Sequence, residues 1–248
     1  MDPVSRRFVL RSGVVAGAGI VAGSALTAGG AGASGARKSG TSGRTPTTVP
    51  VTNGDEALAR LKAGNRRYVS GRSLNQGRNL VRRVQEAEGQ EPFAVILSCS
   101  DSRVSPEVIF DEGIGDLFVV RVAGNTGETP IVQGSIEYAI EHLHSVLIMV
   151  LGHQGCGAVN AALESVHDHT TFPGQIGAFV DPIIPAAQSV QNLPADQQMD
   201  AAIQKNVSNQ VGVLTGLAPI LQPEIASGHV KIVGGEYRLK SGLVKILS

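Results

Sequence analysis

Tryptophan is absent from this sequence, aromatic residues make up only 4% of it, and an excess of basic charge is missing as well. The 21 Lys and Arg residues equal the 21 Asp and Glu residues in number, but they are unevenly distributed. Six basic residues and one acidic residue lie in the first fifty positions, which leaves 15 basic and 20 acidic residues, a net of −5, from position 51 on. A mildly acidic body lacks the basic surface that nucleic acids require, so we expect no nucleic-acid partner.

Long apolar runs are also missing, except near the N-terminus. Gly13 to Ala28 is built from small and apolar residues and follows the pair Arg6-Arg7. A charged start, an apolar middle and small residues are typical of an export signal, and the arginine pair resembles a twin-arginine signal. We expect this signal to cover residues 1–33 and the chain to reach the periplasm or the extracellular space.

Two further expectations follow from this N-terminal composition. A Gly/Ser/Thr/Pro-rich stretch over 34–50 is typical of a flexible linker, which leaves a single domain over 51–248. An uncleaved membrane anchor is the alternative interpretation of the apolar run, but its glycines make it only weakly hydrophobic for a membrane span. We expect no stable membrane span after signal cleavage.

Short apolar runs alternate with helical patterns along the rest of the chain. Continuous apolar runs are typical of strands buried on both faces, and they cover 93–97, 117–122 and 145–151. A fourth strand is expected at 230–233 and a terminal hairpin at 237–247, while helical patterns dominate 176–226. The sequence therefore predicts an α/β fold: a mostly parallel central sheet with helices on both faces and a C-terminal antiparallel hairpin strand.

Cysteine is scarce, and each of the two cysteines follows a predicted buried strand. The first lies in CSDSR (99–103) and the second in HQGC (153–156). Because ligands gather where parallel strands end, both segments are expected at the same edge of the sheet. Two thiols, one imidazole and one carboxylate suit a tetrahedral zinc. We predict one Zn²⁺ per chain, held by Cys99, Asp101, His153 and Cys156.

Three other interpretations of the cysteines remain open. They could be small buried apolar residues, but both have polar neighbours of the kind that bind metals. They could form a disulfide in an oxidising compartment, although the twin-arginine route carries folded cargo that can acquire metal beforehand. A redox or nucleophilic role is less favoured, because the sequence has no C-x-x-C pair and no obvious base outside the cluster.

The two motifs resemble the signature of the β-class carbonic anhydrases. The resemblance extends over LKAGNRRYVSGR (61–72), GQEPFAVILSCSDSRVSPEVIFDEGIGDLFVVRVAGN (89–125), GSIEYAI (134–140) and VLGHQGCGAVNAAL (150–163). It implies that Cys99, His153 and Cys156 bind zinc, and that Asp101 is either the fourth ligand or bonded to Arg103. It further implies reversible hydration of carbon dioxide to bicarbonate and a proton by a zinc-bound hydroxide, with Asp101 and Arg103 as catalytic residues.

The resemblance implies further roles around this centre. Gln90 would hydrogen-bond the substrate, the Gly157 amide would hold a bicarbonate oxygen, and Phe118 and Ala123 would line the carbon dioxide pocket. Each has a plainer alternative: a solvated turn, a helix start or strand packing. The family also implies a homodimer or a higher even oligomer. One departure is Ile96, which stands where some relatives carry the Trp of a regulatory bicarbonate site.

Two other functions remain open at this stage. Some members of the same family hydrolyse carbon disulfide or carbonyl sulfide with the same zinc ligands, and sequence alone does not separate the substrates. A non-catalytic zinc-binding module is the second alternative. The presence of Asp101, Arg103 and Gln90 argues against it, because metal storage requires none of them.

Overall fold

A computed structural model describes residues 51–247, and the predicted signal (1–33) and linker (34–50) lie outside this range. The described residues contain one five-stranded sheet with the order β2-β1-β3-β4-β5. Its strands are β1 (Ala94–Ser98), β2 (Leu117–Arg121), β3 (Leu147–His153), β4 (Lys231–Tyr237) and β5 (Val244–Leu247). The first four are parallel and β5 is antiparallel to β4, so the predicted α/β fold is confirmed.

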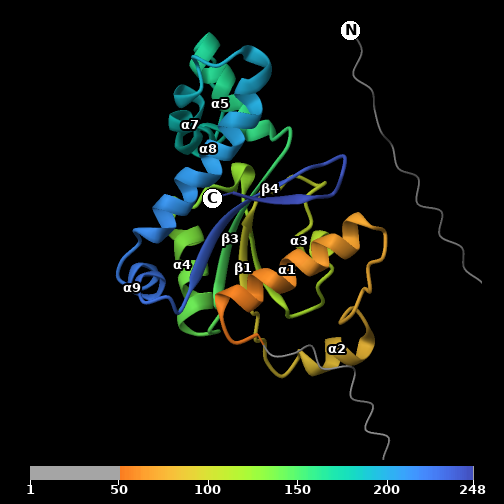
Figure 1. Ribbon diagram of the computed structural model, residues 1–248. Helices are drawn as coiled ribbons and strands as arrows, with labels where there is room; N and C mark the ends of the chain where they lie inside the picture. The colour runs from red at the N-terminus through yellow and green to blue at the C-terminus, as the bar shows by residue number, and fades with distance from the viewer. Residues whose placement is uncertain (1–50, 248) are drawn as a thin grey trace, which may run out of the picture. The chain divides into compact units, whose positions relative to one another are not determined.

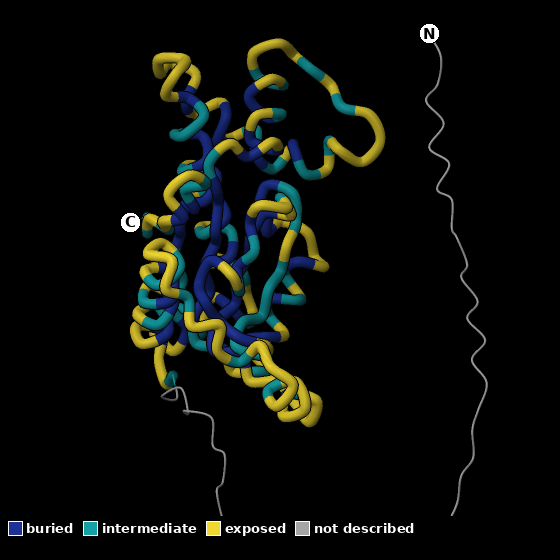
Figure 2. Tube along the Cα trace, turned by 90° about the vertical axis from the view of Figure 1, so that its right-hand side faces the viewer, coloured by how far each residue is buried: buried dark blue, intermediate teal, exposed yellow. Residues whose placement is uncertain are grey.

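Helices cover both faces of the sheet (Figure 1). On one face, α1 (Gly54–Val69) and α3 (Pro106–Ile109) pack through Leu61 and Ile109 against alternate residues of β1 and β3. On the other face lie α4 (Pro130–Glu141), α8 (Ala195–Thr215) and α9 (Leu221–Ala226). Since β1 and β3 have helices on both sides, all of their residues are buried, and the buried chain runs through the middle of the molecule in Figure 2.

A third cluster of helices lies beyond the carboxyl ends of the strands. It contains α5 (Gly157–Asp168), α6 (Gly177–Val180), the short helix η2 (Asp181–Ile183), α7 (Ile184–Ser189) and the first half of α8. Figure 1 shows α5, α7 and this part of α8 grouped above the sheet. Both cysteines belong to the buried core of this cluster. These helices therefore cover the carboxyl ends of the strands, where we expect ligands to bind.

The strand predicted at 230–233 is longer than expected. It runs to Tyr237 and pairs directly with β5, so the predicted terminal hairpin is formed by β4 itself. The prediction stopped at Val233 because Gly234 and Gly235 follow, and glycines usually weaken strands. In the fold, α8 crosses β4 at this point: a Cβ on Gly234 would lie 2.7 Å from a Val207 methyl. The glycine allows the helix to approach the strand.

A buried carboxylate ties α1 to the chain around it. Asp111 accepts hydrogen bonds from Arg67 Nε at 2.6 Å and from the backbone N–H groups of Leu74 and Asn75 at 2.9 and 3.0 Å. Burial raises the pKa of the Asp111 carboxyl, but these donors outweigh it and hold the pKa below its ordinary value. The ionised carboxylate therefore stabilises the connection between α1 and α2 (Leu80–Gln85).

No helix within residues 51–247 combines the length and the apolar character that a membrane span needs.

Candidate metal centre

The two cysteines meet because β1 and β3 are adjacent and in register. Ser98, the last residue of β1, pairs with Leu151, so Cys99 leaves the sheet beside the end of β3 at His153. Gly155, with a φ of 62°, then turns the chain in the left-handed region that favours glycine. This turn brings Cys156 to the N-cap position of α5. Register and turn thus bring together two sulfurs that are far apart in the sequence.

Cys99, His153 and Cys156 converge on one point. Their ligand atoms lie within 4.8 Å of one another, and the three residues are at most 6% exposed. The two Sγ atoms are 3.9 Å apart and both cysteines are free, which excludes the disulfide. Two sulfurs bound to one tetrahedral zinc at about 2.3 Å each would be about 3.8 Å apart. The observed spacing fits a shared zinc.

The imidazole of His153 is oriented for metal binding. Its Nδ1 lies 2.9 Å from the carbonyl oxygen of Gln154, and because a carbonyl only accepts, Nδ1 carries the proton. Nε2 is then a bare acceptor, and it is buried with no hydrogen-bond partner. A backbone carbonyl that fixes the other ring nitrogen is the usual support of a metal-binding histidine. The orphaned nitrogen fits a cation held with the two sulfurs.

The thiols of Cys99 and Cys156 change each other's pKa. The hydrogen bond with Cys156 lowers the pKa of Cys99, burial opposes this shift, and the Gly124 N–H, 3.4 Å from Cys99 Sγ, lowers the pKa further. The Cys99 sulfur and burial raise the pKa of Cys156. Two adjacent buried thiolates repel each other, so both can be ionised together only with a cation between them. Two thiolates and one imidazole therefore fit a bound metal cation such as zinc.

Asp101 lies at the rim of this centre, held by Arg103. Arg103 Nε donates to Oδ1 at 2.9 Å, Nη2 donates to Oδ2 at 2.7 Å, and the Arg103 backbone N–H donates to Oδ1 at 2.9 Å. The Arg103 guanidinium lowers the pKa of the Asp101 carboxyl well below its usual range, although burial opposes the shift. Asp101 Oδ2 is 3.9 Å from His153 Nε2. The carboxylate is ionised and close to the metal ligands, but bonded to arginine.

Arg121 is a residue that the sequence analysis missed. Its Nε donates to the Cys99 carbonyl oxygen at 3.1 Å and its Nη2 to the Asp101 carbonyl oxygen at 2.7 Å. One guanidinium thereby fixes the backbone on both sides of Ser100. In the sequence, an arginine at the end of a strand is expected to be solvated. Arg121 lies beside the CSDSR turn because the strand register pairs it with Ser98.

The four residues expected at the substrate are divided in space. Ala123 packs against the core cluster that contains both cysteines, and Gly157 is the first residue of α5, directly after Cys156. Gln90 is exposed and precedes β1, which separates it from Cys99 by the length of that strand, about 17 Å. Phe118 pairs with Val95 and its ring faces Tyr138, with centroids 6.5 Å apart. The fold of one chain does not bring these last two side chains to the metal centre.

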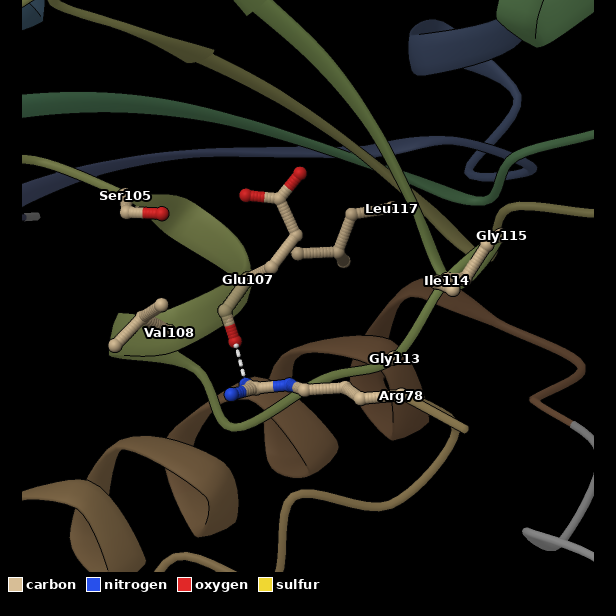
Figure 3. Close-up of a pocket in the computed structure, with 8 residues that line it drawn as sticks. All are labelled: Arg78, Ser105, Glu107, Val108, Gly113, Ile114, Gly115 and Leu117. Atoms are coloured by element: carbon tan, nitrogen blue, oxygen red, sulfur yellow. Dashed lines mark hydrogen bonds between the residues drawn. The ribbon is translucent and has the colours of Figure 1, made fainter. Parts of the chain in front are cut away.

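A cavity of about 430 Å³ lies elsewhere, beside the start of β2. Figure 3 shows that Arg78 crosses it and donates to the Glu107 carbonyl oxygen, at 2.6 Å. Leu117, the first residue of β2, lines it, whereas the cysteines lie at the opposite ends of the strands. None of the proposed zinc ligands lines this cavity.

Comparison with known proteins identifies relatives of this chain. A family model described as carbonic anhydrase matches residues 94–244. The chain is 40% identical over 194 residues to carbonic anhydrase 2 of Mycobacterium tuberculosis, covering 78% of this chain and 93% of that protein. A solved Coccomyxa β-carbonic anhydrase in complex with acetazolamide is 29% identical, with a TM-score of 0.61, and the match covers 77% of this chain and 86% of that one. Two tetrameric β-carbonic anhydrases of the ascomycete Sordaria macrospora share the fold, at 23% identity, a TM-score of 0.63 and coverage of 77% and 97%.

Proposed function

The chain belongs to the β-class carbonic anhydrases, zinc enzymes whose activity is the hydration of carbon dioxide, and from this we propose that Cys99, His153 and Cys156 hold the zinc while Asp101 and Arg103 govern its use. The reaction converts carbon dioxide and water into bicarbonate and a proton, and runs in both directions. The observation that carries the assignment is the buried, unpartnered Nε2 of His153 beside two sulfurs 3.9 Å apart.

The metal and the protein side chains contribute different parts of the chemistry. Zinc, when bound, is a Lewis acid that makes a water nucleophilic near neutral pH. Asp101, kept ionised by Arg103, accepts a hydrogen bond from the attacking nucleophile and fixes which lone pair faces the carbon of carbon dioxide. A carboxyl group with so low a pKa does not keep the proton, which therefore passes to solvent after each turnover.

Asp101 and Arg103 form the gate of this centre in our proposal. A zinc held by Cys99, His153 and Cys156 would have room for one more ligand, Asp101 or water, and the ion pair with Arg103 would keep Asp101 away from it. The Arg103 side chain is 54% exposed, and its guanidinium holds both carboxylate oxygens while the Arg103 backbone N–H holds Oδ1 alone. Loss of that ion pair would let Asp101 close the site.

Ala123 and Gly157 are proposed as substrate contacts beside the metal. Ala123 supplies an apolar surface next to both cysteines, which suits carbon dioxide. The Gly157 amide lies in the first turn of α5, where backbone N–H groups have no partner within the helix. Such an amide can donate to an oxygen of bicarbonate, and the positive end of the helix dipole favours that anion.

Gln90 and Phe118 are proposed to act across a subunit interface. Within one chain both are separated from Cys99 along the strands, so they could reach a substrate only at the metal centre of another copy. This supports a homodimer or a higher even oligomer, as does the tetrameric assembly named for the Sordaria macrospora relatives. Sedimentation analysis tests the assembly: a monomer at all concentrations would remove the proposed roles of both residues.

Export by the twin-arginine route is proposed from residues 1–33 alone, with the mature chain in the periplasm or outside the cell. Mass spectrometry of the protein from the culture supernatant or the periplasm, compared with protein from cells with a disabled twin-arginine translocase, tests the route and the cleavage position.

One experiment tests the proposed function as a whole. Zinc content is measured on the same sample as the initial rates of carbon dioxide hydration and carbon disulfide hydrolysis. We expect one zinc per chain and rapid hydration. Zinc without hydration would indicate a binding module, and carbon disulfide hydrolysis faster than hydration would indicate the other enzyme of the family.

A further inference from the structure

The loop that follows β2 touches the metal centre through a single backbone group. The Gly124 N–H donates to Cys99 Sγ at 3.4 Å. Gly124 has a φ of 71°, and a Cβ at this position would lie 2.5 Å from Ile183 Cδ1. Glycine suits this conformation, which other residues rarely adopt, and any side chain here would displace Ile183. Because glycine is also the most flexible residue, something else must hold the loop so that its N–H points at the sulfur.

Helix α8 supplies that restraint with a buried amide. Asn206 is 1% exposed, and its Nδ2 donates to the Gly124 carbonyl oxygen at 2.9 Å. The carbonyl can only accept, so the orientation of the Asn206 amide is fixed. Both backbone polar groups of Gly124 are thereby hydrogen-bonded: the N–H to the Cys99 sulfur and the C=O to Asn206.

A second amide, one turn further along α8, holds the same loop. Gln210 is fully buried, and its Oε1 accepts a hydrogen bond from the Gly127 N–H at 2.7 Å. Its Nε2 donates to Glu128 Oε1 at 3.3 Å. Residues four apart lie on one face of a helix, so Asn206 and Gln210 form a short polar stripe that faces residues 124–128.

The Asn206 amide is not explained by packing alone. Its Oδ1 is buried without a hydrogen-bond partner, which costs stability in an apolar surrounding. Its neighbour Val207 and the nearby Ile203 pack against Gly152 on β3, so apolar side chains suit this part of the helix. An amide at this place therefore has a role in fixing the loop.

We propose that Asn206 is a positioning residue of the zinc centre: by holding the Gly124 carbonyl it aims the Gly124 N–H at Cys99 Sγ. The inference rests on the proposed zinc site. An N–H donor withdraws charge from a thiolate and fixes its direction, and such outer contacts typically change metal affinity by about 10- to 100-fold. Asn206 contacts no substrate and acts only through Gly124.

The test compares Asn206→Leu with a matched control on the same helix. Gln198, two turns earlier, is also a buried amide, but it donates to the Gln191 and Leu193 carbonyl oxygens at 3.2 and 2.9 Å, away from the zinc ligands. The full-length parent, Asn206→Leu and Gln198→Leu are loaded with zinc, and the rate of zinc release to a chromophoric chelator is measured. The same three proteins are then loaded with Co²⁺ and their sulfur-to-cobalt charge-transfer bands are recorded. Urea unfolding ranks their stabilities.

We expect zinc release from Asn206→Leu to be about tenfold faster than from the parent and its cobalt band to shift, while Gln198→Leu behaves like the parent in both despite a comparable loss of stability. If Asn206→Leu does not fold, Asn206→Ser, whose shorter side chain cannot reach the Gly124 carbonyl, is measured in its place. Parent-like release and spectra, or equal changes in both variants, would overturn the role of Asn206. A parent that binds no zinc would instead overturn the proposed function.

Discussion

Arg103 holds both carboxylate oxygens of Asp101, at 2.9 and 2.7 Å, while one of those oxygens is only 3.9 Å from His153 Nε2. The carboxylate therefore has two partners within reach, a guanidinium on the solvent side and the zinc ligands on the buried side. In the proposed gate, the partner that Asp101 contacts would decide whether water can bind the zinc.

Arg103→Ala should retain zinc and lose most of its activity, because Asp101 then keeps only the hydrogen bond from the backbone N–H of residue 103 and can turn toward the metal. We expect the turnover number to fall by about 10- to 100-fold with one zinc still bound per chain, measured by stopped-flow hydration and metal analysis. Arg103→Lys, which keeps the charge but not the two-point contact, should recover only part of the rate. A turnover number for Arg103→Ala equal to that of the parent would refute the gate.

Removal of the metal should allow the thiols of Cys99 and Cys156 to react with a thiol reagent. Cys99 and Cys156 are 6% and 1% exposed even without a metal, so a reagent reaches them only when the centre opens transiently, and zinc bound to both sulfurs would block the reaction and hold the centre closed. We expect no reaction with a thiol reagent in the zinc-loaded protein and two reactive thiols per chain after chelation, with hydration activity restored when zinc is added back. Cys156→Ser should bind no zinc. Two thiols that react equally well before and after chelation would contradict their role as ligands.

Arg121→Ala should weaken the centre without removing a zinc ligand. The guanidinium that holds the Cys99 and Asp101 carbonyl oxygens is lost, so the turn that carries both side chains becomes mobile. We expect about a tenfold loss of zinc affinity in a chelator competition assay. Arg121→Lys can donate to only one of the two carbonyl oxygens, so its zinc affinity should lie between those of the parent and Arg121→Ala. An affinity unchanged in both variants would show that the turn is rigid without this residue.

Asp111→Asn should destabilise the fold, and the effect should depend on pH. Because the folded-state pKa of Asp111 lies below its unfolded value, its contribution is fully present above the unfolded pKa and is lost as the pH falls through the folded one. At pH 7 we expect a loss of about 2 kcal/mol in the free energy of unfolding. Urea unfolding of parent and variant from pH 7 downward should show the two curves converging in acid. The exposed Asp168→Asn serves as the control and should follow the parent throughout.

The candidate metal centre could be predicted because its residues lie at or just after the ends of buried strands. The apolar runs before Cys99 and before His153 identified two parallel strands, and the rule that ligands gather at strand ends placed the motifs together. Contacts that depend on register could not be predicted in the same way. Arg121 and Asn206 approach the centre from a neighbouring strand and from a helix more than a hundred positions later than Cys99, and no local pattern in the sequence indicates those neighbours.

Gln90 and Phe118 also show that sequence alone does not predict which residues are close in space. Their sequence distance from Cys99 is short or moderate, yet β1 and β2 hold them at a distance within the chain because extended strands separate residues by about 3.3 Å each. The resemblance predicts a role for these residues, and the fold of one chain makes that role depend on the proposed second chain.

The two sulfur ligands are 57 positions apart in the chain. A zinc ion bound to both closes a loop of that length, much as a covalent cross-link would, and it binds only after β1 and β3 are aligned. The ion therefore favours the native state over the unfolded chain by mass action, and the unfolding temperature should follow the free zinc concentration.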